Sequence, residues 1–307
     1  MGEHTEPQPR VGVVPGTRTL DDRTRRTYRY LRASIVALAL LLSVSLVLEF
    51  LRFGEAVERF GSISGYYYSP VRSVFVGALV ALGPALIALK GRPGWEDTLL
   101  DLAGMLIPVV ALVPTPRRQL SGVCLDGSQT CISPDLMPAV RNNVTALIIV
   151  GLAVLVFAWW NTRRGPDDAT RAGVRWAMGT WALFTVVFLV WDEWFFKVAH
   201  NAAAIPFFCL IALFAFLTGH RAPGRSVVPV LRPRWYSTIY RAVSALMLVT
   251  ILVTLLYYGL GWLLGFATWD YTVFLVESVL LVLFVVFWSF QTAENWYSES
   301  VEDTNTA

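Results

Sequence analysis

Charged residues are scarce in this sequence. They make up 15% of the 307 residues, while hydrophobic residues make up 55%. A soluble domain has roughly 45–50% apolar and about 25% charged residues. The chain therefore has more apolar surface than one core can bury, which excludes an ordinary soluble domain.

The sequence also lacks the short motifs of common cofactor and hydrolytic chemistry. It has no phosphate-binding G-x-x-x-x-G-K-[ST] loop, no Rossmann glycine fingerprint, no H-E-x-x-H pair and no G-x-S-x-G elbow. Its three cysteines form no C-x-x-C pair. The basic residues follow a topological pattern rather than a nucleic-acid footprint. We therefore expect no cofactor, no metal and no nucleic-acid partner.

Long apolar runs dominate instead, and several reach the ~20 residues that a helix needs to cross a bilayer. They predict an all-α fold, a polytopic transmembrane helical bundle of about eight spans in the cell membrane. We expect a disordered tail at 1–27, a transmembrane domain at 28–292 and an acidic tail at 293–307. The predicted spans lie at about 33–50, 70–89, 98–115, 143–160, 176–191, 200–218, 239–263 and 271–290.

The placement of positive charge predicts the orientation. With both termini in the cytoplasm, 18 of the 25 Lys and Arg residues lie on the cytoplasmic side and seven on the other. Cytoplasmic loops carry the excess of Lys and Arg in multi-pass proteins. In this topology Cys124 and Cys131 fall in the outer loop at 116–141, where we expect a disulfide bond between them.

Two consecutive spans carry small residues on one helical face. One face combines Ser73, Gly77, Ala81, Pro84 and Ala88; the other combines Asp101, Gly104, Pro108, Ala111 and Thr115. Small residues let membrane helices approach closely. We therefore expect these two helices to pack on each other through these faces.

A polar stretch directly precedes the second span. Ser69 followed by Pro70 predicts a capped helix start, and Arg72 then lies in its first turn. Glu277 lies within the last apolar run, where a lone carboxylate would cost several kcal/mol. We expect Arg72 to reach it, either as part of a functional site or as a structural ion pair. The candidate ligand-binding residues, all placed near the outer leaflet, are Ser64, Tyr67, Arg72, His200, Asp270 and Glu277.

Several segments together carry a family resemblance. They are SISGYYY at 62–68, RSVFVG at 72–77, DLAG at 101–104 and VALVPT at 110–115. These segments resemble an uncharacterised family of bacterial multi-pass membrane proteins, and the later His200, Phe207-Phe208, Ile239-Tyr240-Arg241 and Glu277 are similar to its remaining motifs. Residues 116–197 look like an insertion relative to shorter members. Members often carry Asp where this chain has Ser73, and His near Tyr68, which weakens any acid–base role carried over from them.

The scatter of Ser, Asp and His over these helices is also similar to that of the ceramidase and progestin-receptor-like superfamily of membrane hydrolases. That resemblance would imply a zinc ion held by three histidines. The chain has only His4, His200 and His220, one in a tail and two at opposite membrane faces. A three-histidine zinc site is therefore excluded.

Two functions stay open. The first is a protein that binds or moves a small solute or lipid through an outer-half pocket between the second, sixth and eighth spans. The alternative is an intramembrane hydrolase acting on a lipid headgroup, with Ser64 or a tyrosine, His200 and Glu277 as candidates. Prolines inside three spans slightly favour the first. The expected partners are the lipid bilayer and a small-molecule or lipid ligand; the oligomeric state is left open.

Overall fold

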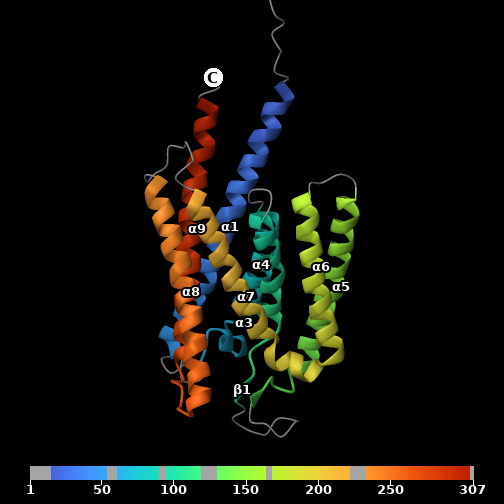
Figure 1. Ribbon diagram of the computed structural model, residues 1–307, viewed down its shortest axis with the longest axis vertical. Helices are drawn as coiled ribbons and strands as arrows, with labels where there is room; N and C mark the ends of the chain where they lie inside the picture. The colour runs from blue at the N-terminus through green and yellow to red at the C-terminus, as the bar shows by residue number, and fades with distance from the viewer. Residues whose placement is uncertain are drawn as a thin grey trace, which may run out of the picture.

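The computed structural model describes residues 15–53, 61–89, 95–118, 130–163, 168–221 and 233–304. This part of the chain is almost entirely helical (Figure 1). Its elements are α1 (Pro15–Phe53), the 3₁₀-helix η1 (Ser64–Tyr68), α3 (Arg72–Ala88), α4 (Trp95–Leu112), β1 (Arg117–Arg118), β2 (Thr130–Cys131), α5 (Met137–Thr162), α6 (Asp168–Val190), α7 (Asp192–Arg221), α8 (Pro233–Leu264) and α9 (Thr272–Thr304). The predicted all-α fold is confirmed, apart from one pair of two-residue strands.

Six of the described helices are long and apolar enough to cross a membrane, which identifies a multi-pass membrane protein. They are α1, α5, α6, α7, α8 and α9. The other two long helices, α3 and α4, differ from these six in length or in charge. Helix α3 is apolar but has only 17 residues. Helix α4 carries Glu96 and Asp97 in its first turn and Asp101 one turn further on.

The first and last helices extend beyond their predicted spans. Helix α1 begins at Pro15, so residues 15–27, predicted to be disordered, are helical. Helix α9 likewise continues to Thr304 through most of the predicted acidic tail. Tyr30 of α1 packs edge-on against Trp296 of α9, with ring centroids 6.4 Å apart. Arg29 lies over the same Trp296 ring at 5.9 Å. These contacts hold the start of the predicted acidic tail, at Trp296, against α1. Residues 1–14 and 305–307 lie outside the described residues.

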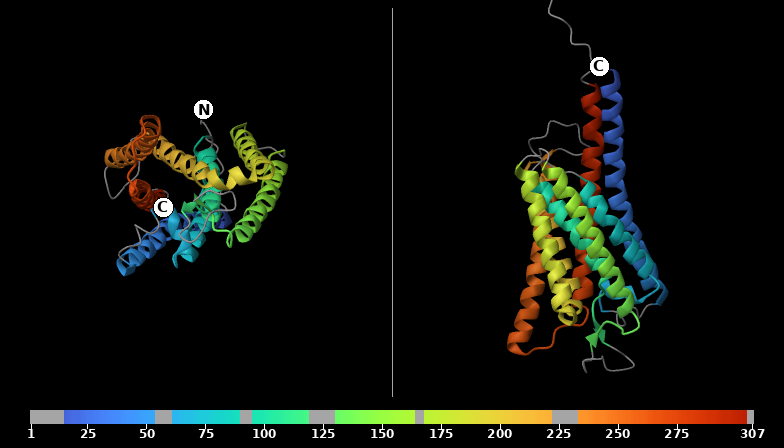
Figure 2. Two further views of the ribbon diagram at one scale, coloured as in Figure 1. Left: turned by 90° about the horizontal axis from the view of Figure 1, so that it is seen from below. Right: turned by 90° about the vertical axis from the view of Figure 1, so that its right-hand side faces the viewer.

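Six helices form a closed ring. Each packs on the next in the order α1, α3, α4, α7, α8, α9 and back to α1. Helices α5 and α6 pack on each other outside this ring, chiefly against α4 (Figures 1 and 2). Helix α1 begins and α9 ends at one end of the molecule, called here the terminal end (Figure 1). The opposite end holds η1 and β1, and is called the η1 end.

Helices α3 and α4 meet at two glycines. A methyl group at Gly83 would lie 2.8 Å from the carbonyl oxygen of Gly104, and one at Gly104 would lie 2.6 Å from that of Gly83. The predicted packing of these two helices is therefore confirmed. The expected face of α4 is buried at Gly104, Pro108 and Ala111.

The prediction of which face of α3 packs against α4 is wrong. All its members, Ser73, Gly77, Ala81, Pro84 and Ala88, are exposed. The helix instead buries Phe75, Ala78, Leu82 and Gly83. Both sides of α3 are apolar, so residue size alone did not distinguish the protein-facing side from the outward-facing one.

The loop after α4 forms the strand pair. Arg117 pairs with Cys131 in antiparallel register. Cys131 is disulfide-bonded and Cys209 is a free thiol. Cys124 lies outside the described residues, so its pairing with Cys131 stays a prediction.

Helix α3 begins later than predicted. Pro70 and Val71 lie in a turn, and the first helical residue is Arg72. The Ser69 hydroxyl donates to the Tyr66 carbonyl at 2.7 Å and accepts from the Val71 N–H at 3.2 Å. Ser69 therefore joins η1 to α3 rather than capping a helix that starts at Pro70.

Candidate functional site

Ser64 connects two ring helices at the η1 end. Its backbone N–H donates to Glu277 Oε2 of α9 at 3.1 Å, and its hydroxyl oxygen lies 2.5 Å from Glu277 Oε1. The same hydroxyl oxygen lies 2.8 Å from His200 Nε2 of α7. His200 Nδ1 lies 2.7 Å from the Val113 carbonyl oxygen at the end of α4. Ser64 and His200 are both buried.

Proton counting restricts this chain of contacts. A carbonyl oxygen only accepts, so His200 Nδ1 carries a proton and donates it to Val113. If Glu277 is protonated, it donates to Ser64, which then donates to neutral His200. If Glu277 is ionised, Ser64 donates to it and doubly protonated His200 donates to Ser64. With neither group protonated, one contact lacks a hydrogen; with both protonated, Ser64 accepts from each and its own hydroxyl hydrogen has no acceptor in this chain. The arrangement that satisfies every group therefore has Glu277 and His200 sharing one proton through Ser64.

Two tyrosine–arginine pairs hold η1 in place. Arg72 lies over the Tyr67 ring at 4.5 Å and donates from Nη2 to the Tyr67 hydroxyl at 3.1 Å. Tyr68 donates to the Thr115 carbonyl at 2.9 Å, and Arg117 lies over its ring at 4.2 Å. Burial raises the pKa of Tyr68 well above its usual value, so this phenol stays a hydrogen-bond donor. The arginines therefore support η1 from α3 and from the strand after α4.

A cavity of about 450 Å³ lies inside the ring, next to Ser64 and Glu277. All six ring helices and η1 contribute to its wall. Most of that wall is aliphatic or aromatic. Its polar side chains are Ser64, Asn201, Thr254, Tyr258 and Glu277. The cavity is therefore apolar along its walls, with a carboxyl, a serine and an amide toward the η1 end.

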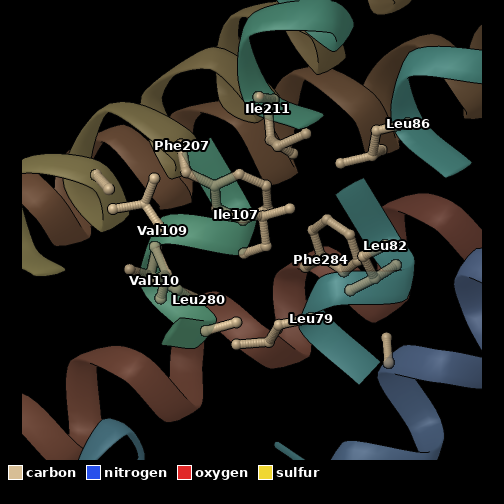
Figure 3. Close-up of a cluster of buried hydrophobic side chains, with 14 of the residues drawn as sticks. Leu79, Leu82, Leu86, Ile107, Val109, Val110, Phe207, Ile211, Leu280 and Phe284 are labelled. Carbon is tan, nitrogen blue, oxygen red and sulfur yellow. The ribbon is translucent and has the colours of Figure 1, made fainter. Parts of the chain in front are cut away.

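Packed apolar side chains close the cavity toward the terminal end. Figure 3 shows side chains from α3, α4, α7 and α9 converging, among them Leu82, Ile107, Phe207 and Phe284, which line the cavity. One or two turns further toward the terminal end, the fully or nearly fully buried residues are Leu86, Ile211, Phe214, Phe287 and Trp288. Phe214 stacks on Trp288 with centroids 6.1 Å apart and meets Phe287 edge-on at 5.8 Å. We call these five residues the apolar plug.

The expected pairing of Arg72 with Glu277 is wrong. Arg72 binds Tyr67, and Glu277 is held by Ser64. Both side chains are within the described residues, and no ion pair joins them. The first-turn position of Arg72 directs its side chain along η1, where the electron-rich face of Tyr67 takes the place of a carboxylate.

Of the six candidate ligand-binding residues, three come together: Ser64, His200 and Glu277. Tyr67 and Arg72 support the element that carries Ser64 and do not line the cavity. Asp270 is exposed in the turn before α9, away from the cavity wall.

Sequence reasoning missed three contributors to this site. Thr254 and Tyr258 lie one turn apart on α8 and face the cavity. Tyrosines near membrane interfaces are ordinary, so nothing in the sequence singled out Tyr258. The Val113 carbonyl that fixes His200 is a backbone group, which no side-chain pattern reveals. The sequence offered one signal for this side of the site. Asn201 directly follows His200, and a pair of polar residues is unusual in an apolar run.

The site combines a hydroxyl, a base and a carboxyl. A serine hydroxyl within hydrogen-bond distance of an oriented histidine is the arrangement of an activated nucleophile. An acyl transfer also needs free N–H donors for the oxyanion. The nearby backbone donors are already engaged: Ser64 N–H with Glu277, Gly65 N–H with the Ser62 hydroxyl at 2.9 Å, and Tyr66 N–H with the Ile63 carbonyl at 3.0 Å. This geometry favours binding over acyl transfer. The described residues contain no group of three metal-ligating side chains.

The fold and the site together define a multi-pass helical membrane protein with an internal apolar cavity and a buried polar cluster at one end. Comparison with protein-family models, with curated proteins and with solved structures finds no match.

Proposed function

We propose that this protein binds a single-chain lipid amphiphile inside the ring, with the headgroup at Ser64 and Glu277 and the chain along the apolar walls. The observation that carries the proposal is the cavity itself. Its volume of about 450 Å³ falls within the range of roughly 300–1,000 Å³ for small-molecule sites. Apolar walls with a few polar groups at one end match the two parts of an amphiphile.

The charges in the wall restrict the headgroup. Among the residues that the structure describes, the wall includes one carboxyl, Glu277, and no Lys or Arg. An anionic headgroup would lose its hydration without gaining a cation, which is costly in an apolar site. A hydroxyl or an ammonium group can donate a hydrogen bond to a Glu277 carboxyl oxygen. The favoured ligand is therefore a long-chain alcohol or amine.

Native mass spectrometry of the purified protein with chain-matched ligands tests this proposal. We expect tetradecanol and tetradecylamine to bind at one equivalent, and tetradecanoate to bind at least tenfold more weakly, since about 1.4 kcal/mol corresponds to tenfold. Ala204 lines the cavity, whereas Ala202 on the same helix is exposed and does not. Ala204→Phe should abolish binding and Ala202→Phe should not. Equal binding of all three ligands, or binding that survives Ala204→Phe, would exclude this site.

The apolar plug bears on whether a ligand is bound or carried across. Its side chains are buried on the terminal side of the cavity, and Phe214 contacts Phe287 and Trp288 there. A carrier would have to separate these aromatic contacts to expose the cavity on the second side. The present arrangement supports a binding protein that is accessible from one half of the membrane.

We further propose that α3 and α4 also cross the membrane, giving eight spans with both termini in the cytoplasm. Both helices lie alongside the others within the ring (Figure 1). Seventeen residues of α3 extend over ~25 Å at ~1.5 Å per residue, close to the hydrocarbon thickness. The charge distribution favours the terminal end as the cytoplasmic one.

Hydrolysis of a lipid headgroup is the second candidate function. The 2.8 Å contact between the Ser64 hydroxyl and His200 Nε2 favours it, together with the anchoring of Nδ1 by Val113. A hydrolase would need Glu277 to release the Ser64 N–H as an oxyanion donor. Covalent labelling of Ser64 by an alkyl fluorophosphonate, lost in His200→Ala, would favour hydrolysis. Absence of labelling under conditions where tetradecanol binds would favour the binding protein.

A further inference from the structure

Among the described residues, those that both line the cavity and are exposed come from two neighbouring helices. Three residues that line the cavity are exposed: Asn201 and Ile205 of α7, and Leu255 of α8. Every lining residue from α1, η1, α3 and α4 is buried, and those of α9 are buried or half-buried. A residue that both lines a cavity and is exposed must lie at its opening. The cavity therefore opens sideways, between α7 and α8.

The arrangement of α7 and α8 accounts for this opening. Near the terminal end the two helices are in close contact: the Ser237 hydroxyl donates to the Gly219 carbonyl at 2.7 Å. A methyl group at Gly219 would lie 3.1 Å from the Tyr240 side chain, so no larger residue fits there without a shift. Toward the η1 end the ribbons of α7 and α8 diverge (Figures 1 and 2). The opening lies in this diverging half.

The opening has a polar and an apolar part. Asn201 and Tyr258 lie toward the η1 end, and Ile205 and Leu255 lie about one turn further toward the terminal end. The same order holds inside, where Ser64 and Glu277 lie at the η1 end of apolar walls. A lipid in the surrounding leaflet is aligned the same way, with its headgroup near the interface and its chain toward the bilayer centre.

What borders the opening is hydrocarbon. Both α7 and α8 are among the helices long and apolar enough to cross a membrane. On α8 the residues next to Leu255, including Leu252, Val253 and Leu256, are exposed and apolar. An aqueous ligand would have to cross this apolar surface, whereas a membrane lipid is already beside it.

We propose that the ligand enters sideways from the membrane leaflet at the η1 end, passing between α7 and α8 with Asn201 and Tyr258 guiding its headgroup. This inference rests on the proposed function, because it concerns the route to the same cavity. It adds the source of the ligand, which is a single-chain lipid already dissolved in that leaflet.

Exchange kinetics of tetradecanol in the full-length protein in phosphatidylcholine vesicles test the route. The release rate is measured by native mass spectrometry at intervals after transfer into ligand-free vesicles. Ile205→Trp and Leu255→Trp should slow uptake and release about tenfold or more, since routes of access act on rates. The matched controls Leu213→Trp on α7 and Leu256→Trp on α8 change exposed residues that do not line the cavity, and should leave both rates unchanged.

Smaller side chains at the opening provide the complementary test. Ile205→Ala and Leu255→Ala should speed release, because they widen the opening without filling the cavity. If the tryptophan variants lose equilibrium binding, faster release in the alanine variants still supports the route, and unchanged release overturns it. Unchanged rates in all four opening variants would place the entrance elsewhere while leaving the binding proposal intact. Absence of tetradecanol binding to the unmodified protein would instead refute the proposed function.

Discussion

Ser64 holds Glu277 by its backbone N–H and its hydroxyl at once, across 213 residues of sequence. The hydroxyl also contacts His200, so one serine joins η1, α7 and α9. A carboxyl within an apolar helix is costly unless it is neutral or paired. Sharing one proton with His200 through Ser64 satisfies that requirement without an arginine or lysine.

The proton-sharing arrangement predicts that Glu277→Gln is tolerated. The Gln amide can donate to the Ser64 hydroxyl and accept from the Ser64 N–H, while Ser64 donates to neutral His200. All hydrogen bonds of the cluster are then retained, and the thermal midpoint in detergent should stay near that of the unmodified protein. Glu277→Ala leaves the Ser64 N–H without its acceptor and should cost about 1–3 kcal/mol. A fall for Glu277→Gln as large as for Glu277→Ala would contradict the shared proton.

Ser64→Ala removes the group that joins His200 to Glu277. We expect a loss of about 1–3 kcal/mol, because buried His200 and half-buried Glu277 lose one shared partner. Ser73→Ala is the matched control, since Ser73 is exposed on α3. Chemical or thermal unfolding of both variants in the same detergent gives the comparison. Equal stability of the two variants would mean that the Ser64 hydroxyl stabilises nothing.

Arg72 and Glu277 should act independently. Arg72→Gln removes the hydrogen bond and the ring contact with Tyr67. Because Glu277 is held elsewhere, the effects of Arg72→Gln and Glu277→Ala on the free energy of unfolding should add to within about 0.5 kcal/mol. A double-mutant cycle measures this sum. A coupling energy of several kcal/mol would instead indicate a direct ion pair between Arg72 and Glu277.

The contact of α3 with α4 should be intolerant of one methyl group. Gly83→Ala brings its Cβ within 2.8 Å of the Gly104 carbonyl oxygen, and should destabilise by roughly 1–3 kcal/mol or more. Gly77→Ala lies on the same helix with no heavy atom within 4 Å of its added Cβ, so it should be neutral or slightly stabilising. Thermal midpoints of the two purified variants separate close packing from helix propensity. Equal midpoints would show that α3 and α4 are further apart.

The proposed topology predicts which sites an impermeant thiol reagent reaches in whole cells. Single cysteines are placed at Arg92, Arg164, Arg225 or Ser128 in a variant lacking the native three. Those at Arg92, Arg164 and Arg225 should resist labelling, and the one at Ser128 should react. Permeabilised cells, where all four should react, provide the control. Labelling at Arg225 without labelling at Ser128 in intact cells would reverse the orientation.

The sequence by itself determined the helices and the class of protein. Apolar runs of membrane-spanning length have few structural alternatives, because in hydrocarbon the backbone must satisfy its own hydrogen bonds. All eight predicted spans therefore coincide with helices of the structure. The sequence also determined that Ser64, His200 and Glu277 lie near one end, since each comes near the start or end of an apolar run and the runs alternate in direction.

The tertiary structure alone decided which side chains meet. A membrane helix is apolar on its lipid-facing and its protein-facing sides alike, so the pattern of α3 did not reveal that Gly83 rather than Gly77 faces α4. The order of helices around the ring, the outer position of α5 and α6 and the cavity all follow from such side-by-side packing. The partner of Glu277 was decided in the same way. Charge alone suggested Arg72 as the partner of Glu277. In the structure, the position of η1 places the Ser64 hydroxyl and N–H against the carboxyl instead.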